Sequence, residues 1–113
     1  MKINPDFSMY EKNVGILIDV KLSGPRTIFK GRGIPSSIWI TKDIDGGSFY
    51  LTDQDNNRLP FGEWVTDYYG KILFPPYLLT NGLRVVTKKA KGLQFIVRYY
   101  TKNTNPTGKE VIK

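Results

Sequence analysis

The chain has 113 residues, a formal net charge of +7, and neither cysteine nor histidine. A chain of this length builds one hydrophobic core, and its apolar content of 40% is high enough to favour folding over disorder. The missing residue types exclude disulfides, zinc sites of the Cys/His kind and every mechanism that needs an imidazole base. We therefore expect a single folded domain that is not an enzyme and holds no cofactor.

Residues 1–12 form the first segment. They are polar, include Pro5 and show no apolar periodicity, so we interpret them as an N-terminal arm that orders only against a partner. The segment also lacks the apolar run of a signal peptide, and the sequence has no stretch suited to crossing a bilayer. We expect a soluble protein made in a cytoplasm, with no membrane partner.

Alternation of apolar and polar residues begins at Val14 and predicts a series of short β-strands. In the first strand one face is apolar, and Leu17 adds some apolar character to the other face. The residues predicted to face the core are Val14, Ile16, Ile18, Val20 and Leu22. Further segments with strand composition are 26–30, 37–41, 48–53, 71–74, 77–80, 83–88 and 93–101.

Turn residues separate these segments. Asp45-Gly46-Gly47, Asp55-Asn56-Asn57 and Asn81-Gly82 contain residues that accept the positive φ of tight turns, and we expect Asn81-Gly82 to close a β-hairpin. Pro75-Pro76 cannot lie inside a central strand, because proline has no N–H to donate to the ladder. This pair therefore marks an edge, a bulge or a connection between sheets.

Short strands at such regular spacing predict an all-β fold. We expect a single antiparallel β-sandwich or jelly-roll-like domain over residues 13–101, with a small closed barrel as the alternative. Residues 102–113, which are polar and contain Pro106, are interpreted as a basic C-terminal tail.

Positive charge is concentrated in the C-terminal third. Lysines and arginines balance acids over residues 1–80, so the excess lies in residues 81–113. A partner attracted by charge should therefore contact this segment. The candidate partner-binding residues are Arg84, Lys88, Lys89, Lys91, Arg98 and Lys102.

The segment Lys91–Tyr100, KGLQFIVRYY, partly matches the octamer of RNA-recognition domains. Leu93, Gln94 and Arg98 depart from that pattern, and the chain lacks the helical periodicity that such a domain requires. A core strand explains the segment better, with Leu93, Phe95, Val97 and Tyr99 on its inner face. Nucleic acid remains an alternative partner, with the basic residues on phosphates and Tyr100 stacking on a base.

The segment PFGEWVTDYYG, which ends at Gly70, is unusually aromatic and is interpreted as a loop. Its aromatic side chains suit a contact between subunits or a platform for stacking a sugar, and the alternative is that they close the core. The candidate residues are Phe61, Trp64, Tyr68 and Tyr69.

The acidic residues suggest no metal or catalytic site. Asp53, Asp55 and Asn57 follow the start of a calcium-binding loop, but the required glycine and the final bidentate glutamate are missing. We therefore expect an ordinary polar hairpin and no metal. The other acids lie mostly in predicted turns, where aspartate is favoured for local hydrogen bonding.

The stretches IPSSIWITKDIDGGSFYLTDQ and LLTNGLRVV alternate short strands with turns rich in Thr, Asn and Gly. In this respect residues 23–100 resemble the small β-sandwich accessory proteins of tailed-bacteriophage virions. The resemblance implies a structural role in capsid decoration, head completion or a tail or fibre. It also implies location in the virion after assembly in the host cytoplasm, and contacts with further copies of the chain and with a major virion protein. A carbohydrate-binding module is a further alternative, for which attachment to a cell surface would be a use.

Overall fold

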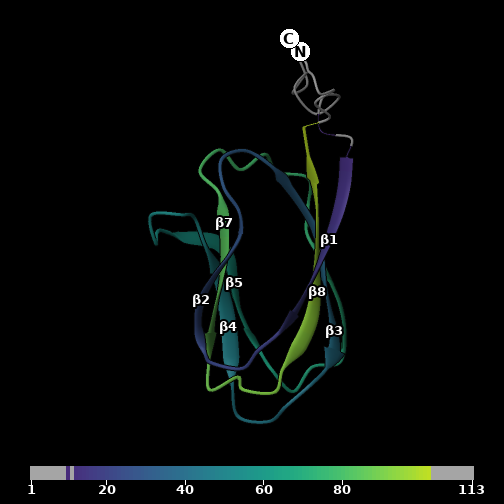
Figure 1. Ribbon diagram of the computed structural model, residues 1–113, viewed down its shortest axis with the longest axis vertical. Coiled ribbons are helices and arrows are strands. Elements are labelled where there is room, and N and C mark those ends of the chain that lie inside the picture. Colours follow the sequence, from purple (N-terminus) through teal and green to yellow (C-terminus); the bar gives the residue numbers. More distant parts are fainter. Residues whose placement is uncertain (1–9, 11, 103–113) are drawn as a thin grey trace.

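A computed structural model describes residue 10 and residues 12–102, and in this part of the chain every regular element is a β-strand. The strands form two four-stranded sheets, both antiparallel, that pack face to face (Figure 1). The predicted β-sandwich is therefore confirmed. The strands are β1 (Lys12–Asp19), β2 (Gly24–Phe29), β3 (Ile34–Lys42), β4 (Ser48–Thr52), β5 (Arg58–Val65), β6 (Gly70–Leu73), β7 (Leu83–Lys88) and β8 (Gln94–Thr101).

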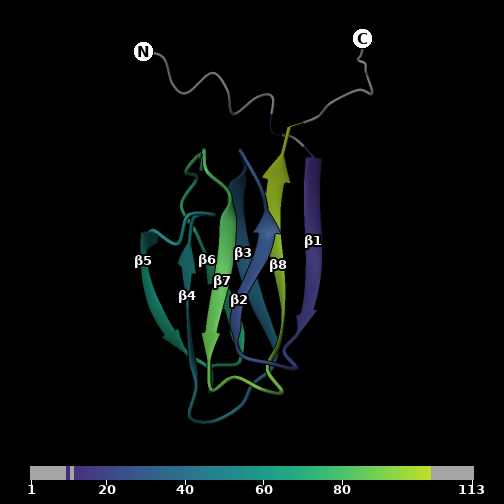
Figure 2. The same ribbon diagram turned by 60° about the vertical axis from the view of Figure 1, so that its left-hand side comes forward.

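The topology is that of a jelly roll. The chain can be described as one long antiparallel hairpin that turns back at residues 53–57, with the strand pairs β1–β8, β2–β7, β3–β6 and β4–β5 along its length. Successive pairs of this hairpin lie alternately in sheet A and sheet B. The further pairings β8–β3 and β7–β4 complete the two sheets. Sheet A has the order β1-β8-β3-β6 and sheet B the order β2-β7-β4-β5 (Figure 2).

The core lies between the two sheets and follows the predicted alternation most closely around β8. Leu93, Phe95, Val97 and Tyr99 are all buried, as predicted. Phe95 stacks on Phe49 of sheet B with ring centroids 6.0 Å apart, so one aromatic pair joins the two layers. The other core residues are Ile18, Val20, Ile28, Phe29, Ile38, Ile40, Leu51, Leu79, Leu83, Val85 and Ala90.

Leu22 is the one residue of the predicted inner face of the first strand that does not contribute to the core. It is 87% exposed, because β1 ends at Asp19 and the chain has turned toward β2 before Leu22 is reached. Leu17 projects outward, as predicted.

The predicted aromatic loop is in part a strand, since β5 covers residues 58–65. Two features hide it in the sequence. Pro60 lowers strand propensity, and an irregular register opposite β4 surrounds Gly62, whose φ is 91°. This bulge shifts the parity of the strand, so Phe61 and Trp64 both pack toward the core although they are three positions apart.

The predicted strand at residues 77–80 is wrong, and so is the hairpin at Asn81-Gly82. Leu79 makes only an isolated bridge to Gly33, and the segment after β6 carries the chain from sheet A to sheet B. Gly82 does have the expected positive φ, 76°. Pro75-Pro76 lies in this connection between sheets, which was one of its predicted positions.

The segment after Lys88 also joins the two sheets and is not a hairpin, because β7 and β8 belong to different layers. Nearly all of the two predicted arms, residues 1–12 and 102–113, lies outside the described residues. Within the described part of the chain, no helix is long and apolar enough to cross a membrane.

Candidate functional site

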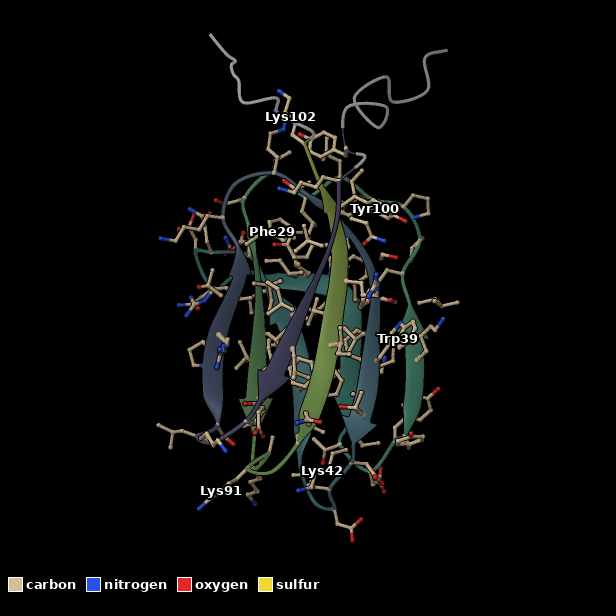
Figure 3. All side chains as sticks on the ribbon, turned by 45° about the vertical axis from the view of Figure 1, so that its right-hand side comes forward. Phe29, Trp39, Lys42, Lys91, Tyr100 and Lys102 are labelled. Carbon is tan, nitrogen blue, oxygen red and sulfur yellow. The ribbon has the colours of Figure 1, made fainter. Side chains whose placement is uncertain are left out.

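The six basic candidates do not form one surface. Arg84 and Lys88 lie on the outer face of sheet B, and Arg98 lies on the outer face of sheet A. Lys89 and Lys91 are exposed in the connection from β7 to β8. Figure 3 shows Lys91 at one end of the sandwich and Lys102 at the other. The connection from β7 to β8 changes layer, so residues that cluster in the sequence do not cluster in space.

The aromatic candidates also divide. Phe61 and Trp64 belong to a chain of ring contacts that runs inward, in which Trp64 lies 5.4 Å from Phe49 and 5.8 Å from Phe74. These two residues help to close the core between β5 and the segment after β6. Tyr68 and Tyr69 are exposed in the turn between β5 and β6. The four side chains therefore do not make one stacking platform.

On the outer face of sheet B, two cations share one carboxylate. Glu63 lies 2.7 Å from the Arg58 guanidinium and 3.7 Å from Lys88 Nζ, and the Arg58 guanidinium lies 3.9 Å from the centre of the Tyr50 ring. A hydrogen bond from Ser48, together with the one from Arg58, lowers the pKa of Glu63 below its usual range.

Arg84 also has a local partner on this face. It donates a hydrogen bond to Asn56 Oδ1 at 2.7 Å, so the cationic side chain is held against the β4–β5 turn. With the Glu63 contacts, this gives the cationic side chains Arg58, Arg84 and Lys88 partners within the described part of the chain, although the buried Nε of Arg84 has no hydrogen-bond partner there.

The turn at Asp53–Asn57 is the polar hairpin that was predicted. One carboxylate oxygen of Asp53 accepts hydrogen bonds from the backbone N–H groups of Asp55 and Asn57, and the other accepts one from the Asn57 side chain. These contacts, the Asn57 side chain first, lower the pKa of Asp53. The described residues contain no group of three or more His, Cys, Asp or Glu placed to hold a metal ion.

Sheet A presents a different outer face, built around Trp39. The register places Leu17 of β1 opposite Ile96 of β8, Ile96 opposite Trp39 of β3, and Trp39 opposite Lys71 of β6. Cross-strand partners share a face of a sheet, so these four side chains form one row across all four strands. Leu17 is 58% exposed and Trp39 38% exposed. At the β6 edge, Leu73 and Tyr69 are also largely exposed.

Two cations flank the Trp39 ring. Lys71 Nζ lies 4.4 Å and Arg98 Cζ 5.8 Å from the ring centre, within the range of a cation–π contact. The indole N–H donates to Ser37 Oγ at 2.9 Å, which fixes the ring orientation. Figure 3 shows Trp39 projecting from the outer side of β3. Neither cation forms an ion pair with a carboxylate of the described residues.

A groove of about 220 Å³ lies beside Trp39 on this face, with Tyr69, Thr41 and Lys71 among its lining residues. Gly15 completes the face on the β1 side. A Cβ atom at Gly15 would lie 3.2 Å from Arg98 Nη1, so the absence of a side chain there lets the arginine lie flat across β1. We call the row Leu17, Ile96, Trp39 and Lys71, together with Arg98, Tyr69 and Leu73, the Trp39 face.

Sequence reasoning placed Trp39 in a strand but did not single it out. A usable signal was present: in SSIWIT the tryptophan alternates with Ile38 and Ile40, both of which are buried. A large aromatic residue out of phase with its buried neighbours must lie on the outer face of the sheet.

No protein-family model matches this chain, and no curated protein has significant similarity to its sequence.

Proposed function

We propose that this protein is a non-enzymatic structural component of a larger assembly and that it docks on a neighbouring protein through the Trp39 face. The assembly that we propose is a bacteriophage virion, in which the chain would serve in capsid decoration, head completion or a tail or fibre. Its binding partners would be further copies of itself and a major virion protein.

One observation carries the proposal. The Trp39 face combines exposed apolar side chains with two cations that no described carboxylate neutralises. An aromatic anchor flanked by an arginine is the composition of interface hot spots, and a large apolar patch on a monomer usually marks a contact. The unneutralised charges favour a partner surface that offers carboxylates around an apolar centre.

The architecture is compatible with this role. Jelly rolls are used repeatedly in viral capsid and lectin domains, although fold alone does not decide function. The proposal therefore depends on the face and not on the topology.

The test is co-purification with particles. Virus particles isolated on a density gradient from the cells that produce the chain should contain it, and cryo-microscopy should place its sheet A against the major particle protein. The Trp39→Ala variant should be lost from the particle fraction, while Tyr50→Ala, which removes the central aromatic side chain of the sheet B face, should be retained. A strictly monomeric protein that is found on no particle would refute the proposal.

A second candidate is binding of single-stranded nucleic acid by the same face. It is favoured by Tyr100, which lies on the outer side of β8 in the same sheet as Trp39 and Arg98, because aromatic side chains among cations suit stacked bases and phosphates. Affinity for an oligonucleotide should then fall steeply as salt is raised, since bound phosphates release counterions. A flat salt response, or no binding at low ionic strength, would eliminate it.

A further inference from the structure

The four edge strands of the sandwich are not equally protected against pairing with another chain. A sheet edge presents unpaired backbone N–H and C=O groups, and proteins usually block such edges with proline, bulges, charges or short strands. At the three protected edges, β2 contains Pro25 and has a register shift against β7, β5 contains Pro60 and the bulge at Gly62, and β6 has only four residues.

Strand β1 has none of these features. Its eight residues pair with β8 one for one without a register shift, and among the described residues β8 is the only strand it pairs with. It contains no proline, and its only charged residues are Lys12 at the start and Asp19 at the end. Figure 2 shows β1 as a long, regular strand at the border of sheet A.

We propose that β1 pairs antiparallel with β1 of a second copy, joining two A sheets into one continuous sheet across a two-fold axis. The inference rests on the proposed function, which it deepens by naming one partner and the strand that binds it. Strand addition of this kind uses main-chain hydrogen bonds that any edge can supply. The charges favour a second copy in the antiparallel direction, because this brings the Lys12 end of one β1 beside the Asp19 end of the other, whereas parallel pairing would align like charges. The two side chains leave the strand on opposite faces, so this is an attraction between strand ends and not an ion pair.

Side-chain alternation restricts the register. Paired residues must share a face, so an outward residue can lie only opposite an outward residue. The register centred on Ile16 meets this condition and pairs residues 13–19 of one copy with the same segment of the other. It places Asp19 opposite Asn13 of the second copy, and Leu17 opposite Gly15 of the second copy. Leu17 would then lie against Arg98 of the second copy, whose guanidinium occupies the space above Gly15.

The first experiment measures self-association of the full chain by sedimentation over a concentration series. Dimers should form, and moderate salt should strengthen them by screening the repulsion between two molecules of charge +7. Leu17→Lys should weaken the dimer about tenfold or more, because the new ammonium would lie near Arg98 of the second copy, which covers Gly15. Leu17→Glu, with the opposite charge at the same site, should retain the dimer.

Val65→Lys is the matched control. It places the same ammonium at an exposed apolar residue of β5, an edge strand of sheet B, so it should leave the dimer unchanged. Equal weakening by Leu17→Lys and Val65→Lys would overturn the proposal, because the loss would then come from the added charge and not from its position on β1.

The second experiment tests the register with thiols, since the natural chain has no cysteine. Asn13→Cys and Asp19→Cys proteins should cross-link through a short thiol-specific reagent when mixed. Neither protein should cross-link alone, because residues 13 and 19 lie about 20 Å apart along a strand. A monomer at every concentration, or a dimer without the mixed cross-link, would overturn the inference. Particle binding by such a protein would leave the proposed function intact, whereas a cross-linked dimer found on no particle would remove the proposed function alone.

Discussion

The two outer faces of this sandwich use the same kinds of residue in opposite ways. Each has an aromatic side chain near two cations: Tyr50 with Arg58 and Lys88 on sheet B, and Trp39 with Lys71 and Arg98 on sheet A. On sheet B a carboxylate, Glu63, contacts both cations. On sheet A no carboxylate of the described residues does so.

This difference shows why the residue content of a face does not by itself indicate a binding surface. Glu63 already pairs with Arg58 and Lys88, so these cations offer little attraction to the carboxylates of a partner. On the Trp39 face the cations and the exposed apolar row are still available, because ring contacts satisfy a cation only in part. The distribution of acids therefore identifies sheet A as the candidate face.

The largest expected effect is on the free energy of unfolding. It tests whether Trp39 is a surface residue or a residue that stabilises the fold, with Trp64 as the reference. Trp64→Ala should lower the free energy of unfolding by about 3 kcal/mol, because it interrupts the ring contacts between Phe49 and Phe74. Trp39→Ala should cost about 1 kcal/mol or less, the size of a lost cross-strand pair. Urea unfolding of both variants measures the two values, and equal losses would mean that Trp39 is a structural residue.

The next effect concerns partner binding. Once a protein from the particle has been identified, Trp39→Ala should weaken binding to it by about 2 kcal/mol or more, which is roughly thirtyfold, as expected for a central aromatic anchor. Tyr50→Ala should keep the affinity within about twofold of that of the unmodified protein, as expected for a residue outside the interface. Isothermal titration calorimetry gives both numbers. Equal weakening by the two variants would contradict the proposal that the outer face of sheet A binds the partner and the outer face of sheet B does not.

The sequence predicts most of the fold, because alternation is local and the core is built from it. The β8 segment is predicted residue by residue, including the burial of Phe95 and Tyr99. β5 is missed because the bulge at Gly62 breaks the period of two on which its recognition depends. The hairpin at Asn81-Gly82 fails for another reason: local residues select a turn, but they do not select which distant strand the chain will join next.

The candidate site is harder to predict than the fold. The concentration of positive charge in the sequence predicted a binding segment from Arg84 to Lys102. In the fold, β7 and β8 belong to different sheets, so those residues are distributed over both outer faces and both ends of the sandwich. Lys71, which flanks Trp39 in space, lies outside that segment. A site assembled from β1, β3, β6 and β8 depends on cross-strand register, and register is set by contacts far apart in the sequence.

A smaller effect tests the charge balance of each face. Glu63→Gln should lower stability at low salt, because it leaves Arg58 and Lys88 close together without their shared acid, and the loss should shrink in high salt. Lys71→Met should not lower stability, since methionine keeps the length of the chain and its sulfur contacts aromatic rings favourably. The unfolding temperatures of the Glu63→Gln and Lys71→Met variants, measured in low and in high salt, compare the two faces. A comparable salt-dependent loss in Lys71→Met would show that sheet A is balanced by its own charges as well.

The smallest effect is the pH dependence, and it should arise from the β4–β5 region. The pKa values of Glu63 and Asp53 are both lowered, by hydrogen bonds from Ser48 and Asn57 first. A carboxylate whose pKa is lower in the folded state stabilises the fold above its unfolded pKa, about 4 for these groups, and that contribution is lost as the pH falls through the folded value. Stability should therefore be constant from about pH 7 to pH 5 and decline below that range. The double variant Glu63→Gln, Asp53→Asn should show a shallower decline in urea unfolding midpoints between neutral and acidic pH. An unchanged slope would place the acid-sensitive groups elsewhere and would remove the claim that the hydrogen bonds of Glu63 and Asp53 stabilise their charged forms.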